Sequence, residues 1–193
     1  MTIQTPAASA AEITPLTEAD VRRIVNEEVT KAFANNPASR RAAIIASKGT
    51  LDWAYPPLIL ANAAAAAGMQ VSMFFTFYGL NIIHRDFEKK LKVDPVGNPA
   101  MPMPVPMPDL ITGMPGMVTM ASKMMRSRFK KNNVATIRTL LDSARELEVR
   151  LIACQMTVDV FDYAPEEFID GIEFGGAAAF MSEARRSEVN LFI

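Results

Sequence analysis

Hydrophobic positions along this chain follow two periods, one typical of buried strands and one typical of amphipathic helices. Short runs of apolar, β-branched and aromatic residues, such as RAAIIAS and VSMFFTFY, predict strands. Longer segments with apolar residues three or four positions apart predict helices. The predicted strands cover residues 41–47, 71–78, 149–154, 171–174 and 190–193, and the predicted helices cover 55–67, 80–92, 117–131, 134–148 and 177–188, with another helix beginning at 158.

Strands separated by helices predict an α/β fold, in which helices cover both faces of a mostly parallel sheet as a three-layer α/β/α arrangement. Ligands in such folds bind beyond the carboxyl ends of the strands. Glycines in the segments predicted at that edge let the backbone approach a small ligand, although turn geometry alone also explains them. The pocket candidates there are Ser47, Lys48, Gly49, Tyr78, Gly79, Gln155, Met156, Gly175 and Gly176.

The N-terminal part of the chain differs from this α/β pattern. We expect residues 1–15 to be disordered and residues 17–34 to form an amphipathic helical arm that ends before Pro37. The apolar face of that arm contains Val21, Ile24, Val25, Val29 and Phe33. No basic start precedes an apolar run, so we expect no signal peptide. The predicted organisation is therefore residues 1–38 as disordered start and arm, and residues 39–193 as the α/β domain.

One uncharged stretch, residues 53–83, is long enough to cross a bilayer. Pro56 and Pro57 mark the start of a helix within it, Gly68 ends that helix, and a strand pattern follows. Polar side chains within the stretch would be costly in lipid. A helix followed by a strand is therefore the better interpretation.

Composition excludes several functional classes. Lys and Arg number 20 against 21 Asp and Glu, so no net charge favours nucleic acid as a partner. A single cysteine, Cys154, permits no disulfide within the chain and suits a reducing cytoplasm. A single histidine, His84, argues against an ordinary zinc site, and we predict no metal site.

Cys154 is the strongest chemical candidate. It ends a predicted strand in VRLIACQMTVDVFDY, and the next residues predict the first turn of a helix. Free amides in that turn would favour the thiolate, which is the nucleophilic form of cysteine. The alternative is that Cys154 is a small, buried and inert apolar residue, as free cysteines often are.

Four features along the chain carry a resemblance: SKGTLDWAYPPLILANAAAAAGMQVSMFFTFYGL, the Met/Pro-rich interruption, ACQMTVDVFDY and GIEFGGAAAFMSEARRSEVNLFI. Together they resemble the DsrE/DsrF-like sulfur-relay family, most closely its larger single-domain subgroup, which is sometimes labelled peroxiredoxin-like. The resemblance covers residues 40–193 and implies a small α/β protein that assembles as a homo-oligomer. It also implies a strand-end cysteine that carries sulfane sulfur as a persulfide, matched here by Cys154.

The resemblance therefore implies a sulfurtransferase or sulfur carrier. Its implied partners are a rhodanese-type sulfur donor and a small TusA-like carrier. Because the chain has no second thiol, release of the sulfur requires a thiol from another molecule. Lys48 is a candidate to hold an anionic persulfide, although a lysine at a strand end is more often a solvated charge.

Other catalytic templates do not match. True peroxiredoxins carry a Pro-x-x-x-Thr-x-x-Cys pattern, whereas VRLIA precedes Cys154 here, which argues against a peroxidase. The chain also lacks a Walker A loop and a Gly-x-Gly-x-x-Gly turn, so we expect no cofactor.

The Met/Pro-rich insertion at residues 93–125 is the second unusual feature. Seven prolines fall within residues 93–116, and eight of the 13 methionines lie between Met101 and Met125. Such a segment suits a lid, a surface that docks a sulfur carrier, or a membrane-interface contact beside the basic helix that follows. Copper(I) binding by thioethers and burial in an oligomer interface are further options. The alternative function is thus a noncovalent binding or assembly module, either free or membrane-peripheral, that uses the Met-rich segment and has an inert buried cysteine.

Overall fold

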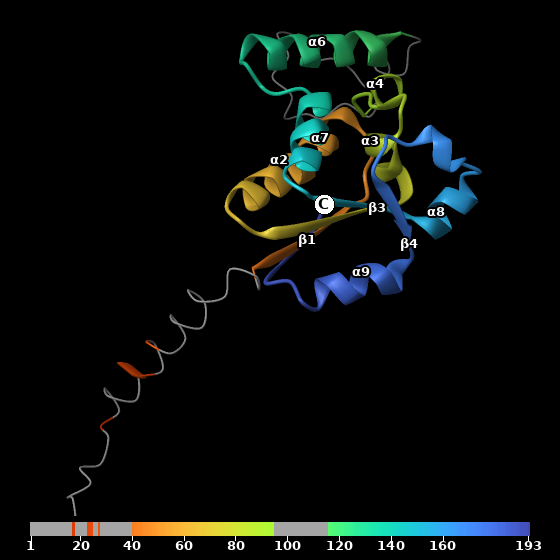
Figure 1. Ribbon diagram of the computed structural model, residues 1–193. Helices are drawn as coiled ribbons and strands as arrows, with labels where there is room; N and C mark the ends of the chain where they lie inside the picture. The colour runs from red at the N-terminus through yellow and green to blue at the C-terminus, as the bar shows by residue number, and fades with distance from the viewer. Residues whose placement is uncertain (1–16, 18–22, 25–26, 28–39, 95–115) are drawn as a thin grey trace, which may run out of the picture. The chain divides into compact units, whose positions relative to one another are not determined.

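Figure 1 shows the computed structural model, which describes residues 17, 23–24, 27, 40–94 and 116–193. The chain divides into two compact units, residues 1–37 and 38–193. In the first unit Arg23, Ile24 and Glu27 are helical and exposed. The rest of the predicted arm, the predicted disordered start and most of the Met/Pro-rich insertion lie outside the described residues.

The second unit is built on a five-stranded sheet in the order β4-β3-β2-β1-β5. The strands are β1 (Arg41–Ala46), β2 (Gln70–Phe75), β3 (Arg150–Cys154), β4 (Ile172–Gly175) and β5 (Val189–Phe192). Every neighbouring pair is parallel, so the carboxyl ends of all strands meet at one edge. This confirms the predicted parallel α/β sheet.

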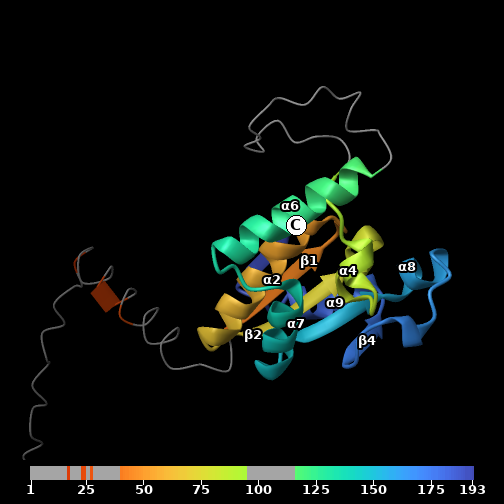
Figure 2. The same ribbon diagram turned by 90° about the horizontal axis from the view of Figure 1, so that it is seen from above.

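Helices cover both faces of the sheet, as predicted. The helices α2 (Leu51–Ala66) and α7 (Ile137–Glu146) lie on one face and α9 (Ala177–Ala184) lies on the other (Figure 1). A further helix, α6 (Met117–Lys131), lies on the outer side of α2 (Figure 2). Among the described residues, every helix is too short or too polar to cross a membrane.

Successive side chains along a strand point to opposite faces of the sheet, which explains why both faces are covered. On β1, Ile44 belongs to the large core under α2, whereas its neighbour Ala43 belongs to a smaller core on the opposite face. The same division separates Met73 from Phe74 on β2. Because most side chains on both faces of these central strands are apolar and buried, each face requires a helical layer.

The predicted single helix at residues 80–92 is wrong. The structure has two short helices instead, α3 (Leu80–Ile83) and α4 (Phe87–Lys90), separated by an extended His84. The His84 backbone forms an antiparallel bridge with Phe168, and its Nδ1 accepts a hydrogen bond of 2.9 Å from the Asp86 amide. These contacts redirect the chain where local pattern alone favours a continuous helix.

Other boundaries moved by a few residues. The helix predicted to start at 55 begins at Leu51, so Pro56 and Pro57 lie inside α2 rather than at its start. The strand predicted to reach residue 78 ends at Phe75, and a 3₁₀ turn, η2 (Phe77–Gly79), follows. A helix expected from residue 158 already begins after Cys154 as α8 (Gln155–Val160), and a second 3₁₀ turn, η3 (Pro165–Glu167), follows it.

Candidate functional site

Cys154 lies where β3 ends and α8 begins, at the carboxyl edge of the sheet. It is the last residue of β3 and also the N-cap of α8. Its register partner on β4 is Gly175. The residue is 4% exposed, so the thiol is close to the surface but largely covered.

Two threonines, Thr157 and Thr76, place hydrogen-bond donors near this thiol. The hydroxyl oxygens of Thr157, in the first turn of α8, and Thr76, just after β2, are 3.3 Å apart. Thr157 is itself 1% exposed, and its Oγ1 also accepts a hydrogen bond of 3.3 Å from the Phe77 amide. The position of both hydroxyls is thus fixed by contacts between two neighbouring strand ends.

These donors control the ionisation of the thiol. Burial on its own raises the pKa of Cys154. Hydrogen bonds from the hydroxyl and amide of Thr157, the hydroxyl of Thr76 and the amide of Met156 outweigh burial and lower the pKa below its ordinary value. The arrangement therefore favours a thiolate, the form that acts as nucleophile and as leaving group.

Exposed apolar side chains form a rim next to the buried thiol. We define this apolar rim as Phe77, Tyr78, Met156 and Val160. Tyr78 and Val160 are 65% and 64% exposed, and the Tyr78 ring stacks on Phe161 at a centroid distance of 5.7 Å. Large apolar groups left exposed to water are typical of a surface that binds a partner.

The candidate glycines allow the strand-end turns to pack closely. A Cβ on Gly79 would overlap the Ala46 carbonyl oxygen, and a Cβ on Gly49 would overlap the Tyr78 carbonyl oxygen. Gly175 is tight but less so, since a Cβ would lie 3.3 Å from Ile152 and from Ala179. A Cβ on Gly176 would meet nothing within 4 Å. Gly49 and Gly79 thus hold two turns of the edge against each other.

The remaining candidates lie at the same edge with other contacts. Ser47 donates from its amide and its hydroxyl to the main-chain oxygen of Ile193, at 2.7 and 3.0 Å. The Lys48 ammonium lies 3.3 Å from the centroid of the Trp53 ring. Both residues follow β1, and β2 separates that strand from β3. On α8, Gln155 Nε2 donates to Asp159 at 2.7 Å.

Thr76 and Thr157 were not among the residues singled out from the sequence. The usable signal was a threonine three residues after the cysteine, in the predicted first turn of a helix. For Thr76 there was no comparable signal. Thr76 is far from Cys154 along the chain, and the two residues come close only because their strands are neighbours in the sheet.

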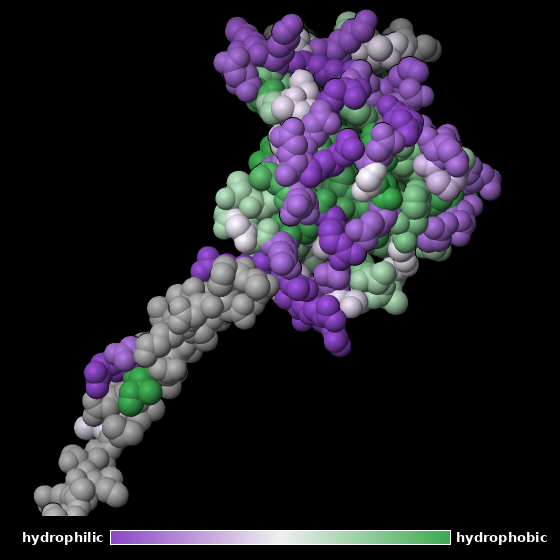
Figure 3. Space-filling model, in the orientation of Figure 1, coloured by the Kyte–Doolittle hydropathy of each residue, from purple (hydrophilic) through white to green (hydrophobic). Residues whose placement is uncertain are grey.

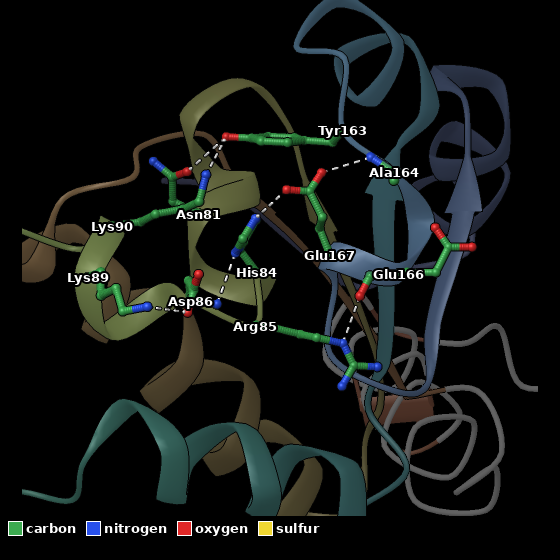
Figure 4. A network of polar contacts seen from close by, with 10 residues as sticks. All are labelled: Asn81, His84, Arg85, Asp86, Lys89, Lys90, Tyr163, Ala164, Glu166 and Glu167. Atoms are coloured by element: carbon green, nitrogen blue, oxygen red, sulfur yellow. Dashed lines mark hydrogen bonds and ion pairs between the residues drawn. The ribbon is translucent and has the colours of Figure 1, made fainter.

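His84 does not act as a base for Cys154 in this arrangement. Its ring packs against Tyr163 and Phe168, its Nδ1 accepts from the Asp86 amide, and its Nε2 lies 3.4 Å from Glu167 Oε1 (Figure 4). Burial and the nearby Lys90 ammonium lower the pKa of His84, partly offset by Glu167 and Asp86. Within the described part of the chain, no group of three or more His, Cys, Asp or Glu residues suits a metal ion.

Comparisons with known proteins agree with this geometry. Residues 38–192 match the DsrE/DsrF/DrsH-like family. Sulfur carrier protein DsrE2 of Allochromatium vinosum is 51% identical over 158 residues, which cover 80% of this chain and 98% of that protein. The uncharacterized protein YrkE of Bacillus subtilis is 33% identical over 158 residues, with the same 80% and 98% coverage.

Among solved structures, the YchN protein of E. coli matches with a TM-score of 0.49 and 12% identity, covering 80% of this chain and 99% of that one. The sequence matches extend over nearly the whole α/β unit and include the strand end that carries Cys154. On these matches, the chain belongs to the DsrE/DsrF/DrsH-like family.

Proposed function

We propose that this protein carries sulfane sulfur as a persulfide on Cys154 and passes it to an acceptor thiol. The observation that carries the proposal is the position of Cys154 at the end of β3 and the start of α8, where donors on Thr157, Thr76 and Met156 lower its pKa despite its burial. An inert core cysteine needs no such donors, because burial alone keeps it a neutral thiol. The similarity to a protein named as a sulfur carrier supports the same role.

The transfer is two thiol exchanges with no net redox change. In the first, the Cys154 thiolate attacks the outer sulfur of a donor persulfide, a new S–S bond forms, and the donor leaves as a thiolate. In the second, an acceptor thiolate attacks the outer sulfur on Cys154 and expels the Cys154 thiolate. Thr76, Thr157 and the Met156 amide stabilise that thiolate as nucleophile in the first exchange and as leaving group in the second.

The surroundings of the thiol support protein partners rather than small anions. The apolar rim offers area for a docking protein, and Lys48, the cation expected to hold an anion, lies over Trp53 beyond the neighbouring strand. We therefore propose a rhodanese-type donor and a TusA-like acceptor, in the cytoplasm, with this protein acting as a sulfurtransferase or carrier. Self-association as a homo-oligomer remains part of the same proposal.

Intact-protein mass spectrometry tests the covalent step. The protein is incubated with polysulfide, or with thiosulfate and a rhodanese, alongside the Cys154→Ser variant. We expect a gain of one sulfur atom that reductant reverses and that the variant lacks. The absence of an adduct on the wild-type protein, with Cys154 resistant to alkylation until unfolding, would contradict the proposal.

The alternative is a noncovalent binding or assembly module, either free or membrane-peripheral. Two observations favour it, the 4% exposure of Cys154 and the charge of α6. That helix carries five cations and no carboxylate, namely Lys123, Arg126, Arg128, Lys130 and Lys131. The rate of Cys154 alkylation at neutral pH separates the two functions, because a thiolate reacts quickly and a protected thiol does not.

A further inference from the structure

A cavity lies away from Cys154, between α6, the start of α7, α2 and α4. Its volume is about 770 Å³, within the usual range for small-molecule sites. The apolar walls are formed by Leu51, Phe87, Leu91, Phe129, Val134 and Ile137. The outward surface of α6, which forms one wall, is mostly hydrophilic (Figure 3).

Tyr55 contributes a polar group to the lining of this cavity. Its side chain lies against Phe129 with ring centroids 4.6 Å apart, and the residue is only 9% exposed. The phenol hydroxyl is a hydrogen-bond donor in the lining of the cavity. Burial raises the pKa of Tyr55 while Arg126 lowers it in part, so the hydroxyl stays a neutral donor close to a guanidinium.

The other polar groups of the cavity are also donors. Arg126 Nη2 donates to the Glu88 and Leu91 carbonyl oxygens at 2.6 and 3.0 Å, which ties α6 to the end of α4. Arg138 pairs with the Glu88 carboxylate at 3.1 Å. Lys130 forms no hydrogen bond or ion pair with any described residue.

The charge balance of the cavity is positive. Among the described lining residues, three cations, Arg126, Lys130 and Arg138, face one carboxylate, Glu88, which is already paired. A ligand that satisfies the spare donors must supply acceptors and negative charge. A ligand that fits the walls must also carry an apolar body.

We propose that this cavity binds an amphipathic monoanion, specifically a free medium-chain carboxylate. The carboxylate accepts hydrogen bonds from the Tyr55 hydroxyl and the guanidinium of Arg126, and Lys130 neutralises its charge. The hydrocarbon chain lies against Phe129, Leu91 and the other apolar walls. The site is separate from the sulfur chemistry proposed for Cys154 and does not depend on it.

Isothermal titration of the full chain with decanoate tests the proposal. Decanol, which has the same chain without the charge, and butyrate, which has the charge without the chain, are the matched ligands. We expect decanoate to bind at least roughly tenfold more tightly than either, since each lost contribution is worth ~1.5 kcal/mol or more. Equal binding of decanol and decanoate, or no binding of decanoate, would overturn the proposal.

Variants locate the site. Tyr55→Phe removes the donor without opening a void, and Lys130→Gln removes the unpaired charge; each should weaken decanoate binding on the order of fivefold to tenfold. Lys131→Gln on the same helix lies outside the cavity and should leave binding unchanged. If Tyr55→Phe fails to fold, as judged by circular dichroism, the exposed Lys130→Gln variant carries the test. Unchanged affinity in Lys130→Gln, or an equal loss in Lys131→Gln, overturns the assignment.

Discussion

The hydroxyl oxygens of Thr76 and Thr157 lie 3.3 Å apart, on two segments that are 81 residues apart along the chain. Donors on both threonines lower the pKa of Cys154 against the effect of its burial, which raises it. Thr157 is almost fully buried and further held by the Phe77 amide, so the pair is preorganised rather than recruited by a ligand. The thiol environment is thus built jointly by the ends of β2 and β3.

Replacing Thr157 by valine should raise the pKa of Cys154, because the isosteric side chain cannot donate to the sulfur. Alkylation of Cys154 at neutral pH should slow on the order of fivefold to tenfold, since a hydrogen bond to a charged group is worth ~1.5 kcal/mol. The measurement is the alkylation rate as a function of pH. Cys154 is the only cysteine in the sequence, so this rate describes its thiol alone. Thr119→Val, an exposed position on α6, is the control and should change nothing.

The close packing of the β1 and β2 turns predicts a large cost for a single methyl group. Gly79→Ala should lower the free energy of unfolding by about 3 kcal/mol or more, because its Cβ would overlap backbone at Ala46 that cannot move aside. Gly176→Ala, where a Cβ meets nothing within 4 Å, should stay within about 1 kcal/mol of wild type. Urea titration measures both, and similar losses in the two variants would show that the edge relaxes freely.

Local pattern was sufficient for the strands but not for the segments between them. Apolar runs such as residues 41–46 and 150–154 identified β1 and β3, and parallel order followed from the helices between strands. The break at His84 was missed because its cause is a bridge to Phe168, more than 80 residues away. A helical pattern carries no information about such a partner.

In the candidate site, too, local sequence predicts some features, whereas others depend on residues that are distant along the chain. Cys154 was identified from its place between a strand and a helix turn, which the structure reproduces. The sequence predicts a helix start at Pro56 and Pro57, but packing of Leu51 and Ala54 into the core extends α2 backward past them. The Thr76 contact required knowing that β2 and β3 are neighbours, which sequence order alone does not specify.

His84 predicts a pH-dependent stability. Its pKa is lowered by burial and by Lys90, with Glu167 and Asp86 opposing, so the unfolded chain binds the proton more readily than the folded one. Stability should therefore be complete above the ordinary histidine pKa of about 6.5 and should fall as the pH drops below it. Protonation would also place a hydrogen on Nδ1, which accepts from the Asp86 amide.

His84→Asn separates this effect from general acid destabilisation. Asparagine retains an acceptor for the Asp86 amide but does not titrate. The variant should be less stable than wild type at neutral pH because the smaller side chain leaves space in a buried site. Its loss of stability between neutral and mildly acidic pH should be smaller, as measured by urea unfolding at several pH values. An unchanged slope would assign the pH dependence to another group.

Phe77 combines a strained backbone with an exposed aromatic ring. Its φ of 47° lies in the left-handed region, which is unfavourable for a bulky residue, yet its side chain is 52% exposed and so gains little from burial. Strain kept at an exposed site near the Cys154 thiol indicates a role other than stability. On the proposed function, that role is contact with the protein that delivers or receives sulfur.

Phe77→Asn should therefore leave stability unchanged or slightly higher, since asparagine tolerates a positive φ. Sulfur transfer from a persulfidated rhodanese should slow several-fold, whereas transfer from polysulfide, which needs no docking surface, should keep its rate. Phe192→Asn is the matched control, an exposed phenylalanine on β5 that β1 and β2 separate from β3. If both donors slow equally in Phe77→Asn, Phe77 acts on the thiol itself; if neither slows, the apolar rim does not dock the donor. Only a selective loss with the protein donor, absent in Phe192→Asn, assigns Phe77 to recognition, because a change in thiol reactivity would affect every sulfur source alike.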